Sequence, residues 1–188
     1  MIYVILGSMG FGFLMLFDYA SMKNFGSSKY IFGLFGIGLL TSNTLLVILE
    51  PTTISFYFVE KYSSMLLALI FLALLIYSVF IEVGSNTYEK TAKPELITNG
   101  TYKLVRHPGV IWFFFTYLFA SFFFENALLF VAAVVWGLLN VIYTYFQEKI
   151  ILVRIFDNYK EYIRTTPMFI PNITSLKKFM AIENWRKE

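Results

Sequence analysis

The chain has 188 residues, of which 58% are hydrophobic and only 14% are charged, and this much apolar surface does not fit inside a water-soluble core of ordinary size. It contains no cysteine, which excludes disulfides, thiolate zinc sites and iron–sulfur clusters, and its single histidine, His107, excludes a polyhistidine metal site. We therefore expect an all-α integral membrane protein with no metal and no nucleic-acid partner.

Five apolar stretches follow one another along the chain with almost no charge inside them. Several reach the roughly 20 residues that a helix needs to cross a bilayer. We predict five transmembrane helices, the last two of which form a C-terminal helical hairpin turning at Glu125–Asn126. The five stretches are Ile2–Phe17, Tyr30–Leu49, Met65–Ile81, Gly109–Phe124 and Ala127–Phe146.

The positive charges indicate how these helices are oriented. If each stretch crosses once and the N-terminus is outside, the inner segments are 18–29, 82–107 and 147–188. These segments hold fourteen of the fifteen Lys and Arg residues, and only Lys61 is left outside. Because positive residues are retained on the cytoplasmic side, we predict a multi-pass protein with its N-terminus outside and a cytoplasmic amphipathic tail.

No internal repeat or low-complexity linker divides the chain, so we predict one membrane domain over 1–188. It has a three-helix part over 1–81, a part over 82–171 that carries the polar motifs, and an interfacial tail over 172–188. Apolar residues alternate with lysines in this tail and favour a helix that lies on the inner leaflet. They are Ile173, Leu176, Phe179, Met180 and Trp185.

Two features of the second stretch allow more than one interpretation. Gly33 and Gly36 permit close helix approach and, with the Phe-rich faces, a homodimer. The polar run Thr41-Ser42-Asn43-Thr44 lies at membrane depth. It makes either hydrogen bonds between helices or a polar ligand pocket.

The last apolar stretch is predicted to continue as a helix beyond the membrane. Ile151, Ile155, Tyr159 and Tyr162 recur at helical spacing, and Thr165-Thr166-Pro167 ends the pattern.

Arg106-His107-Pro108 stands directly before the fourth stretch, and each residue type has a physical role there. Proline suits the first helical position, since it fixes φ and needs no hydrogen-bond acceptor. A helix start presents free N–H groups and a partial positive charge, and Arg106 adds a permanent cation, so the site attracts a carboxylate or phosphate. The alternative is that the tripeptide clamps a lipid headgroup or that His107 merely caps the helix.

A second polar cluster lies at the end of the fifth stretch. Asn140, Thr144, Gln147 and Glu148 are spaced to lie along one helix face, and such a stripe usually faces a cavity. The hairpin brings it alongside His107 on the cytoplasmic side. An anion site beside a carboxylate suits a zwitterionic ligand, such as an amino acid or a sulfonium-bearing compound. Alternatively, Glu148 pairs with Arg154 or Lys149 in solvent.

Residues 95–171 resemble the C-terminal region of the isoprenylcysteine carboxyl methyltransferase and phospholipid methyltransferase superfamily. The resemblance rests on the block Asn99-Gly100-Thr101-Tyr102-Lys103-Leu104-Val105-Arg106-His107-Pro108, on Glu148 after an apolar hairpin, and on Phe156, Tyr159, Tyr162 and Thr166-Pro167-Met168-Phe169-Ile170-Pro171.

The resemblance implies an integral-membrane enzyme that binds S-adenosylmethionine at the cytoplasmic face and methylates a lipophilic small molecule or lipid that arrives from the bilayer. The part over 82–171 would then be the cofactor-binding part. Arg106 would orient the acceptor, and Glu148 would contact the cofactor and act with Arg106 as the catalytic pair. The cofactor pocket would include Tyr102, Val105, His107, Pro108, Glu148, Tyr159 and Tyr162.

Two other functions fit the sequence. Membrane sterol and enone reductases have a similar helical C-terminal domain that binds a nicotinamide cofactor, and a small lipid-binding or transport protein could use the Arg-His-Pro helix start only to hold headgroups. Radiolabelled methyl transfer to a lipid extract distinguishes the first function from both of these.

Overall fold

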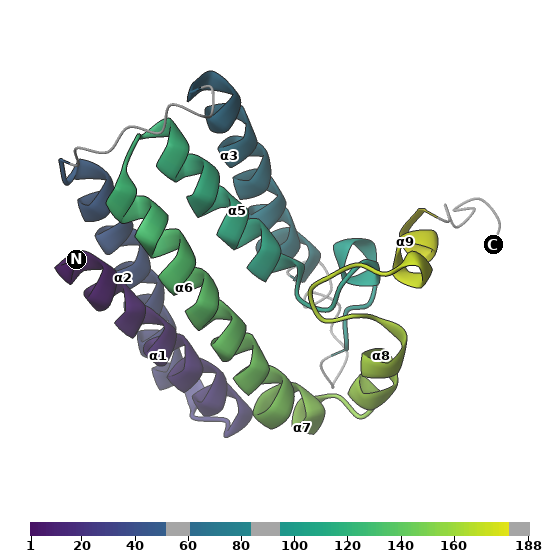
Figure 1. Cartoon of the computed structure of the whole chain (residues 1–188). Coiled ribbons are helices and arrows are strands. Elements are labelled where there is room, and N and C mark those ends of the chain that lie inside the picture. Colours follow the sequence, from purple (N-terminus) through teal and green to yellow (C-terminus); the bar gives the residue numbers. More distant parts are fainter. Residues whose placement is uncertain (52–60, 84–94, 181–188) are drawn as a thin grey trace.

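The computed structural model describes residues 1–51, 61–83 and 95–180, and over these residues the chain is helical with no strand. Figure 1 shows the helices as a long bundle with two short helices beyond one end. The elements are α1 Ile2–Met22, η1 Gly26–Ser28, α2 Lys29–Leu49, α3 Lys61–Ile76, η2 Tyr77–Glu82, η3 Gly100–Lys103, α5 Pro108–Phe123, α6 Ala127–Phe146, η4 Gln147–Leu152, α7 Val153–Ile155, α8 Tyr159–Thr165 and α9 Ile173–Met180.

Four helical stretches of the described chain are long and apolar enough to cross a membrane, in keeping with a multi-pass membrane protein. They are Ile2–Met22, Gly26–Leu49, Lys61–Glu82 and Ala127–Ile155. The fourth predicted span, α5, has only 16 residues because Pro108 begins it and the hairpin turn follows Phe123. At 1.5 Å per residue it is about 24 Å long, less than the ~30 Å hydrocarbon core.

The helices pack in two groups joined by the predicted hairpin. Helices α1, α2 and α6 form one group, and α3 packs on α5, which in turn packs on α6 (Figure 1). The hairpin turns at Glu125, whose φ is +49°, and Asn126, whose side chain caps α6 by accepting a hydrogen bond from the Leu129 amide at 2.8 Å. The same Asn126 donates to the Val47 carbonyl at 2.9 Å and so ties the turn to the end of α2.

The core lies where α1, α2 and α6 meet. Trp136 and Val47 are fully buried in it, and the Trp136 indole donates to the Val4 carbonyl at 3.0 Å. Outside this core the helices expose large apolar side chains, such as Leu34 at 74% and Leu49 at 77%. Exposed surface of this kind is unfavourable in water, and lipid tails cover it in a membrane.

The structure decides how the second stretch uses its small and polar residues. Gly36 faces α1, since a Cβ there would lie 2.9 Å from Leu14 and 3.0 Å from the Gly10 carbonyl oxygen, and Gly33 faces Phe17. These glycines therefore serve packing inside one chain, and the homodimer stays a prediction without their support. Of the polar run, Thr44 makes an interhelical hydrogen bond with the Tyr117 hydroxyl at 2.6 Å, whereas Thr41, Ser42 and Asn43 donate to carbonyls of α2 itself.

The last long helix ends earlier than predicted. It continues through η4 and α7 to Ile155, but Phe156 is extended and the chain turns before α8 begins at Tyr159. The prediction of one continuous helix to Tyr162 is therefore wrong, although α8 does end at Thr165 as expected. This turn allows Tyr159 and Tyr162 to face back toward the bundle, where both are buried.

Within the tail, the short helix α9 exposes Ile173, Phe179 and Met180 beside Lys177 and Lys178, and its place on the inner leaflet stays a prediction. Trp185 lies outside the described residues.

Candidate functional site

The segment 99–108 forms a compact turn that leads into α5. It begins at Gly100, whose φ is +53°, forms the short helix η3 and continues to the buried Val105. His107 is the N-cap of α5 and Pro108 occupies the first turn, as the sequence predicts.

The two blocks of the sequence motif, about 60 residues apart, pair with each other. The Arg106 amide donates to the Pro167 carbonyl at 2.9 Å, and the His107 amide donates to the Met168 carbonyl at 3.2 Å. The Tyr162 hydroxyl donates to the Tyr102 carbonyl at 2.6 Å. The segments 99–108 and 159–168 therefore form one structural unit at the end of the bundle.

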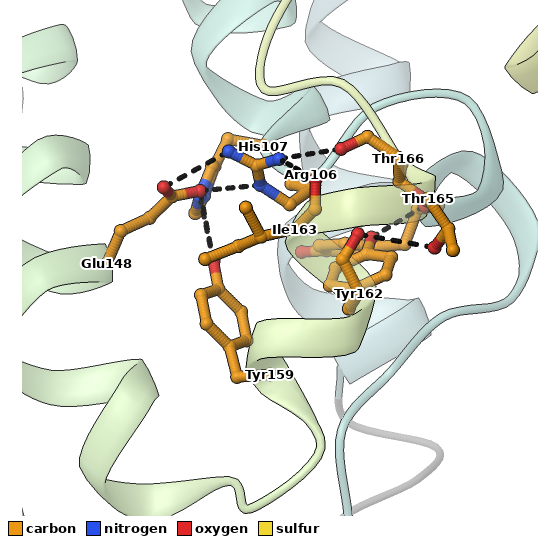
Figure 2. A network of polar contacts seen from close by, with 9 residues as sticks. Arg106, His107, Glu148, Tyr159, Tyr162, Ile163, Thr165 and Thr166 are labelled. Carbon is orange, nitrogen blue, oxygen red and sulfur yellow. Dashed lines mark hydrogen bonds and ion pairs between the residues drawn. The ribbon is translucent and has the colours of Figure 1, made fainter.

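Glu148 joins this unit to the end of α6 (Figure 2). Its carboxylate receives a bidentate pair from Arg106, at 2.7 Å from Nε and 3.1 Å from Nη2, and it lies 2.8 Å from His107 Nε2. The Tyr159 hydroxyl donates to the same carboxylate at 3.1 Å. The predicted convergence of His107 and Glu148 is therefore confirmed. Glu148 is only 6% exposed, so the alternative of a solvent pair with Lys149 or Arg154 is wrong.

Arg106 is committed to the protein itself. Besides Glu148, its Nη1 donates to the Ile163 carbonyl at 3.1 Å and to the Thr166 carbonyl at 2.6 Å, and the residue is 9% exposed. The guanidinium thus holds the end of α6 and the end of α8 to the motif segment. Its role in orienting an acceptor stays a prediction.

The direct contact between His107 and Glu148 changes the expected shape of the site. The sequence predicts a ligand between an anion site and a carboxylate, but His107 Nε2 and the Glu148 carboxylate are in direct contact at 2.8 Å, so a ligand cannot lie between them. The residues of the predicted polar stripe on α6 and η4 also face different surroundings. Gln147 donates to Asp18 of α1 at 2.7 Å, and Tyr143 donates to the same carboxylate at 2.5 Å. Thr144 is buried, and Asn140 is partly exposed.

A cleft of about 540 Å³, in the size range of small-molecule sites, is lined in part by the segments 99–108 and 159–168. Of the predicted cofactor residues, Tyr162 is the one that lines this cleft. The others, Tyr102, Val105, His107, Pro108, Glu148 and Tyr159, are outside its lining. The lining consists of Leu96, Thr98, Asn99, Lys103, Asn158, Glu161, Tyr162, Thr165, Thr166 and Lys178.

The tyrosines around the unit are neutral hydrogen-bond donors at physiological pH. Burial, assisted by the negative charge of Glu82, raises the pKa of Tyr102 to about 12. Burial also raises the pKa values of Tyr159 and Tyr162, and the Glu148 carboxylate adds to the effect at Tyr159.

The sequence analysis singles out neither of two acids that bind partners from distant elements, the partly buried Asp18 and the buried Glu82. Glu82 is 8% exposed and accepts a hydrogen bond from the Thr101 amide at 2.8 Å. A lone carboxylate at the end of an apolar stretch is the signal that could have found both. No group of three potential metal ligands occurs within the described residues.

Comparisons with protein-family models, curated proteins and solved structures find no match to this chain.

Proposed function

We propose that the protein transfers a methyl group from S-adenosylmethionine to a hydrophobic acceptor that partitions into the membrane. The observation that carries the proposal is that the two blocks of the methyltransferase-like motif fold against each other and wall one cleft. Asn99 and Lys103 come from the first block, and Tyr162 and Thr166 come from the second.

The residues of this cleft fit the chemistry of that cofactor. Lys103 and Lys178 supply cations for a carboxylate, and Glu161 supplies an anion for an ammonium group or ribose hydroxyls. Thr98, Asn99 and Asn158 add neutral hydrogen-bonding groups. A cleft that combines both charges with amide and hydroxyl groups suits a zwitterionic nucleoside.

The chain would contribute mainly alignment and exclusion of water. When bound, S-adenosylmethionine supplies a methyl group that its positive sulfur already activates. The hydrogen bonds from Arg106 to the Ile163 and Thr166 carbonyls would keep the two walls of the cleft at a fixed separation, which is what a reaction governed by alignment requires. A carboxylate acceptor needs no base. An amine or thiol acceptor must lose a proton, and His107 and Glu148 are the nearby groups able to accept it.

Calorimetric titration of the purified protein in detergent with S-adenosylhomocysteine tests the proposal. We expect saturable binding that Glu161→Ala weakens, since Glu161 lines the cleft, whereas Lys160→Ala, at the exposed neighbouring position outside the lining, leaves affinity unchanged. His107 and Glu148 lie outside the lining, so their substitution should weaken binding only by loosening the segment that forms the wall, and unchanged affinity in both would show that their contact does not influence the cleft. Absence of binding would contradict the proposal, and binding of NADPH instead would favour the reductase.

A further inference from the structure

Glu82 holds the start of the motif segment in the way that Glu148 holds its end. Its carboxylate accepts hydrogen bonds from both the amide and the hydroxyl of Thr101. The Thr101 hydroxyl also lies 3.0 Å from the Ser78 hydroxyl, which accepts a hydrogen bond from the Trp112 indole at 3.1 Å. The end of α3, the short helix η3 and the start of α5 therefore meet in one buried polar network.

The position of Glu82 accounts for the glycine of the motif. Gly100 has a φ of +53°, a conformation that favours glycine. A Cβ on Gly100 would also overlap the Glu82 carboxylate. Both the positive φ of Gly100 and the lack of room beside it exclude a side chain here. The lack of room is due to Glu82.

Both glutamates lie in the same kind of backbone irregularity. Glu82 ends the π-helical turn η2 at the end of α3, and Glu148 lies in the π-helical turn η4 at the end of α6. A π-helical turn inserts a residue into a helix, changes the direction of the side chains that follow, and occurs frequently at functional sites. In this protein each turn places a buried carboxylate against one end of the segment 99–108.

The cleft depends on this segment. Asn99 immediately precedes the pair that Glu82 holds, and Lys103 follows it within the same short helix η3. Both residues line the cleft, although Glu82 itself does not.

We propose that Glu82 is a positioning residue: by holding Gly100 and Thr101 it fixes the wall of the cleft that Asn99 and Lys103 form. The effect of Glu82 on cofactor affinity rests on the proposed function. The effect of Glu82 on the wall of the cleft can be measured without any ligand.

The first test compares three variants by affinity for S-adenosylhomocysteine and by thermal stability in detergent. Glu82→Ala leaves the buried Thr101 amide without its acceptor, and we expect about a tenfold loss of affinity. Glu82→Gln keeps an oxygen that can accept this bond and should recover most of the affinity. Gly7→Ala is the control for stability, since its Cβ would overlap Trp136 in the bundle core, away from the cleft.

The positioning role predicts that Gly7→Ala lowers the melting temperature but leaves affinity within about twofold of wild type. An equal loss of affinity in Gly7→Ala, or wild-type affinity in Glu82→Ala, would overturn it.

The second test is hydrogen exchange of the wild-type and variant proteins without ligand. Glu82→Ala should accelerate exchange in a peptide over 99–104, whereas 105–110, held by Glu148 and by the 167–168 pairing, should keep its protection. Unchanged exchange over 99–104, or equal loss of protection in both peptides, would contradict the role of Glu82 at the wall. If the wild-type protein binds no S-adenosylhomocysteine, the proposed function is overturned, and this measurement still decides whether Glu82 positions the wall.

Discussion

The Arg106 side chain uses the planar shape of its guanidinium as well as its positive charge. Its guanidinium makes two bonds to the Glu148 carboxylate and two to backbone carbonyls at the end of α8. A lysine ammonium is a point donor on a flexible stem and does not reproduce this planar arrangement. The geometry of the site therefore depends on the fork of the arginine as much as on its charge.

Arg106→Lys should lower the free energy of unfolding by about 2–3 kcal/mol, because at least one buried carbonyl loses its donor. Arg154→Lys is the control, since Arg154 is exposed. Thermal unfolding in detergent measures both variants. Equal melting temperatures for the two would show that the contacts of Arg106 contribute nothing to stability.

The raised pKa of Tyr102 predicts that the protein loses stability in alkaline solution. Its pKa rises from 10.0 to about 12 on folding, so the folded state keeps the phenol neutral where the unfolded state ionises. The contribution of Tyr102 is complete below pH 10 and is lost as the pH rises from about 10 through 12. Tyr102→Phe should therefore show a shallower fall in melting temperature over this interval than the wild type. Identical slopes for the two proteins would contradict the burial of this phenol.

At the scale of elements, the hairpin turn depends on one side chain. Asn126 is 3% exposed, caps α6 through its oxygen, and donates through its nitrogen to the carbonyls of Val47 and Glu50 at 2.9 and 3.2 Å. It thus connects the beginning of one membrane helix to the end of another.

Asn126→Ala should cost about 1–2 kcal/mol of stability from the lost cap alone, and more from the hydrogen bonds that the Val47 and Glu50 carbonyls lose. Asn140→Ala removes the same side chain from a partly exposed position within α6 and should be close to neutral, since alanine favours helix. The comparison is made by thermal unfolding, and a neutral Asn126→Ala would show that the turn forms without its cap.

The elements also show how far the sequence determines the structure. Apolar stretches predict the helices, and Pro108 and Asn126 mark where two of them begin, because these signals are local. The π-helical turns at Glu82 and Glu148 carry no local signal. The break after Ile155 was missed because the apolar spacing continues to Tyr162 although the backbone turns at Phe156.

At the candidate site, too, some features follow from local sequence signals and others depend on contacts between distant residues. The hairpin predicts that His107 and Glu148 lie at one end of the bundle, since two antiparallel helices joined by a short turn must bring those ends together. It does not predict that the two side chains touch, which depends on packing by α8. The partners of Asp18 and Glu82 are far away in sequence, so their roles appear only in the folded chain.

At the scale of the whole molecule, the open point is whether the short helix α5 crosses the membrane. The chain lacks cysteine, so single cysteines can be introduced and labelled with a membrane-impermeant reagent. Five crossings predict that Ser27→Cys and Lys160→Cys react only after permeabilisation and that Phe124→Cys, at the hairpin turn, reacts in intact cells. Phe124→Cys that reacts only after permeabilisation would mean that the hairpin does not cross.

The predicted topology places the two ends of the bundle on opposite sides of the membrane. Lys61 lies 3.4 Å from Glu125 at the end that holds the hairpin turn, and the cleft with Lys103 and Lys178 lies at the other end. A cleft with both charges at the predicted cytoplasmic face would be open to a water-soluble cofactor, while a lipophilic acceptor could reach the same end of the bundle through the bilayer.

The most direct test of the methyltransferase proposal is transfer of a radiolabelled methyl group from S-adenosylmethionine to a membrane lipid extract by the purified protein in liposomes. The proposal predicts label in the organic phase with the wild-type protein. Glu161→Ala should lose most of that label, while Lys160→Ala should retain it. Label that stays entirely in the aqueous phase with the wild-type protein would contradict the assignment.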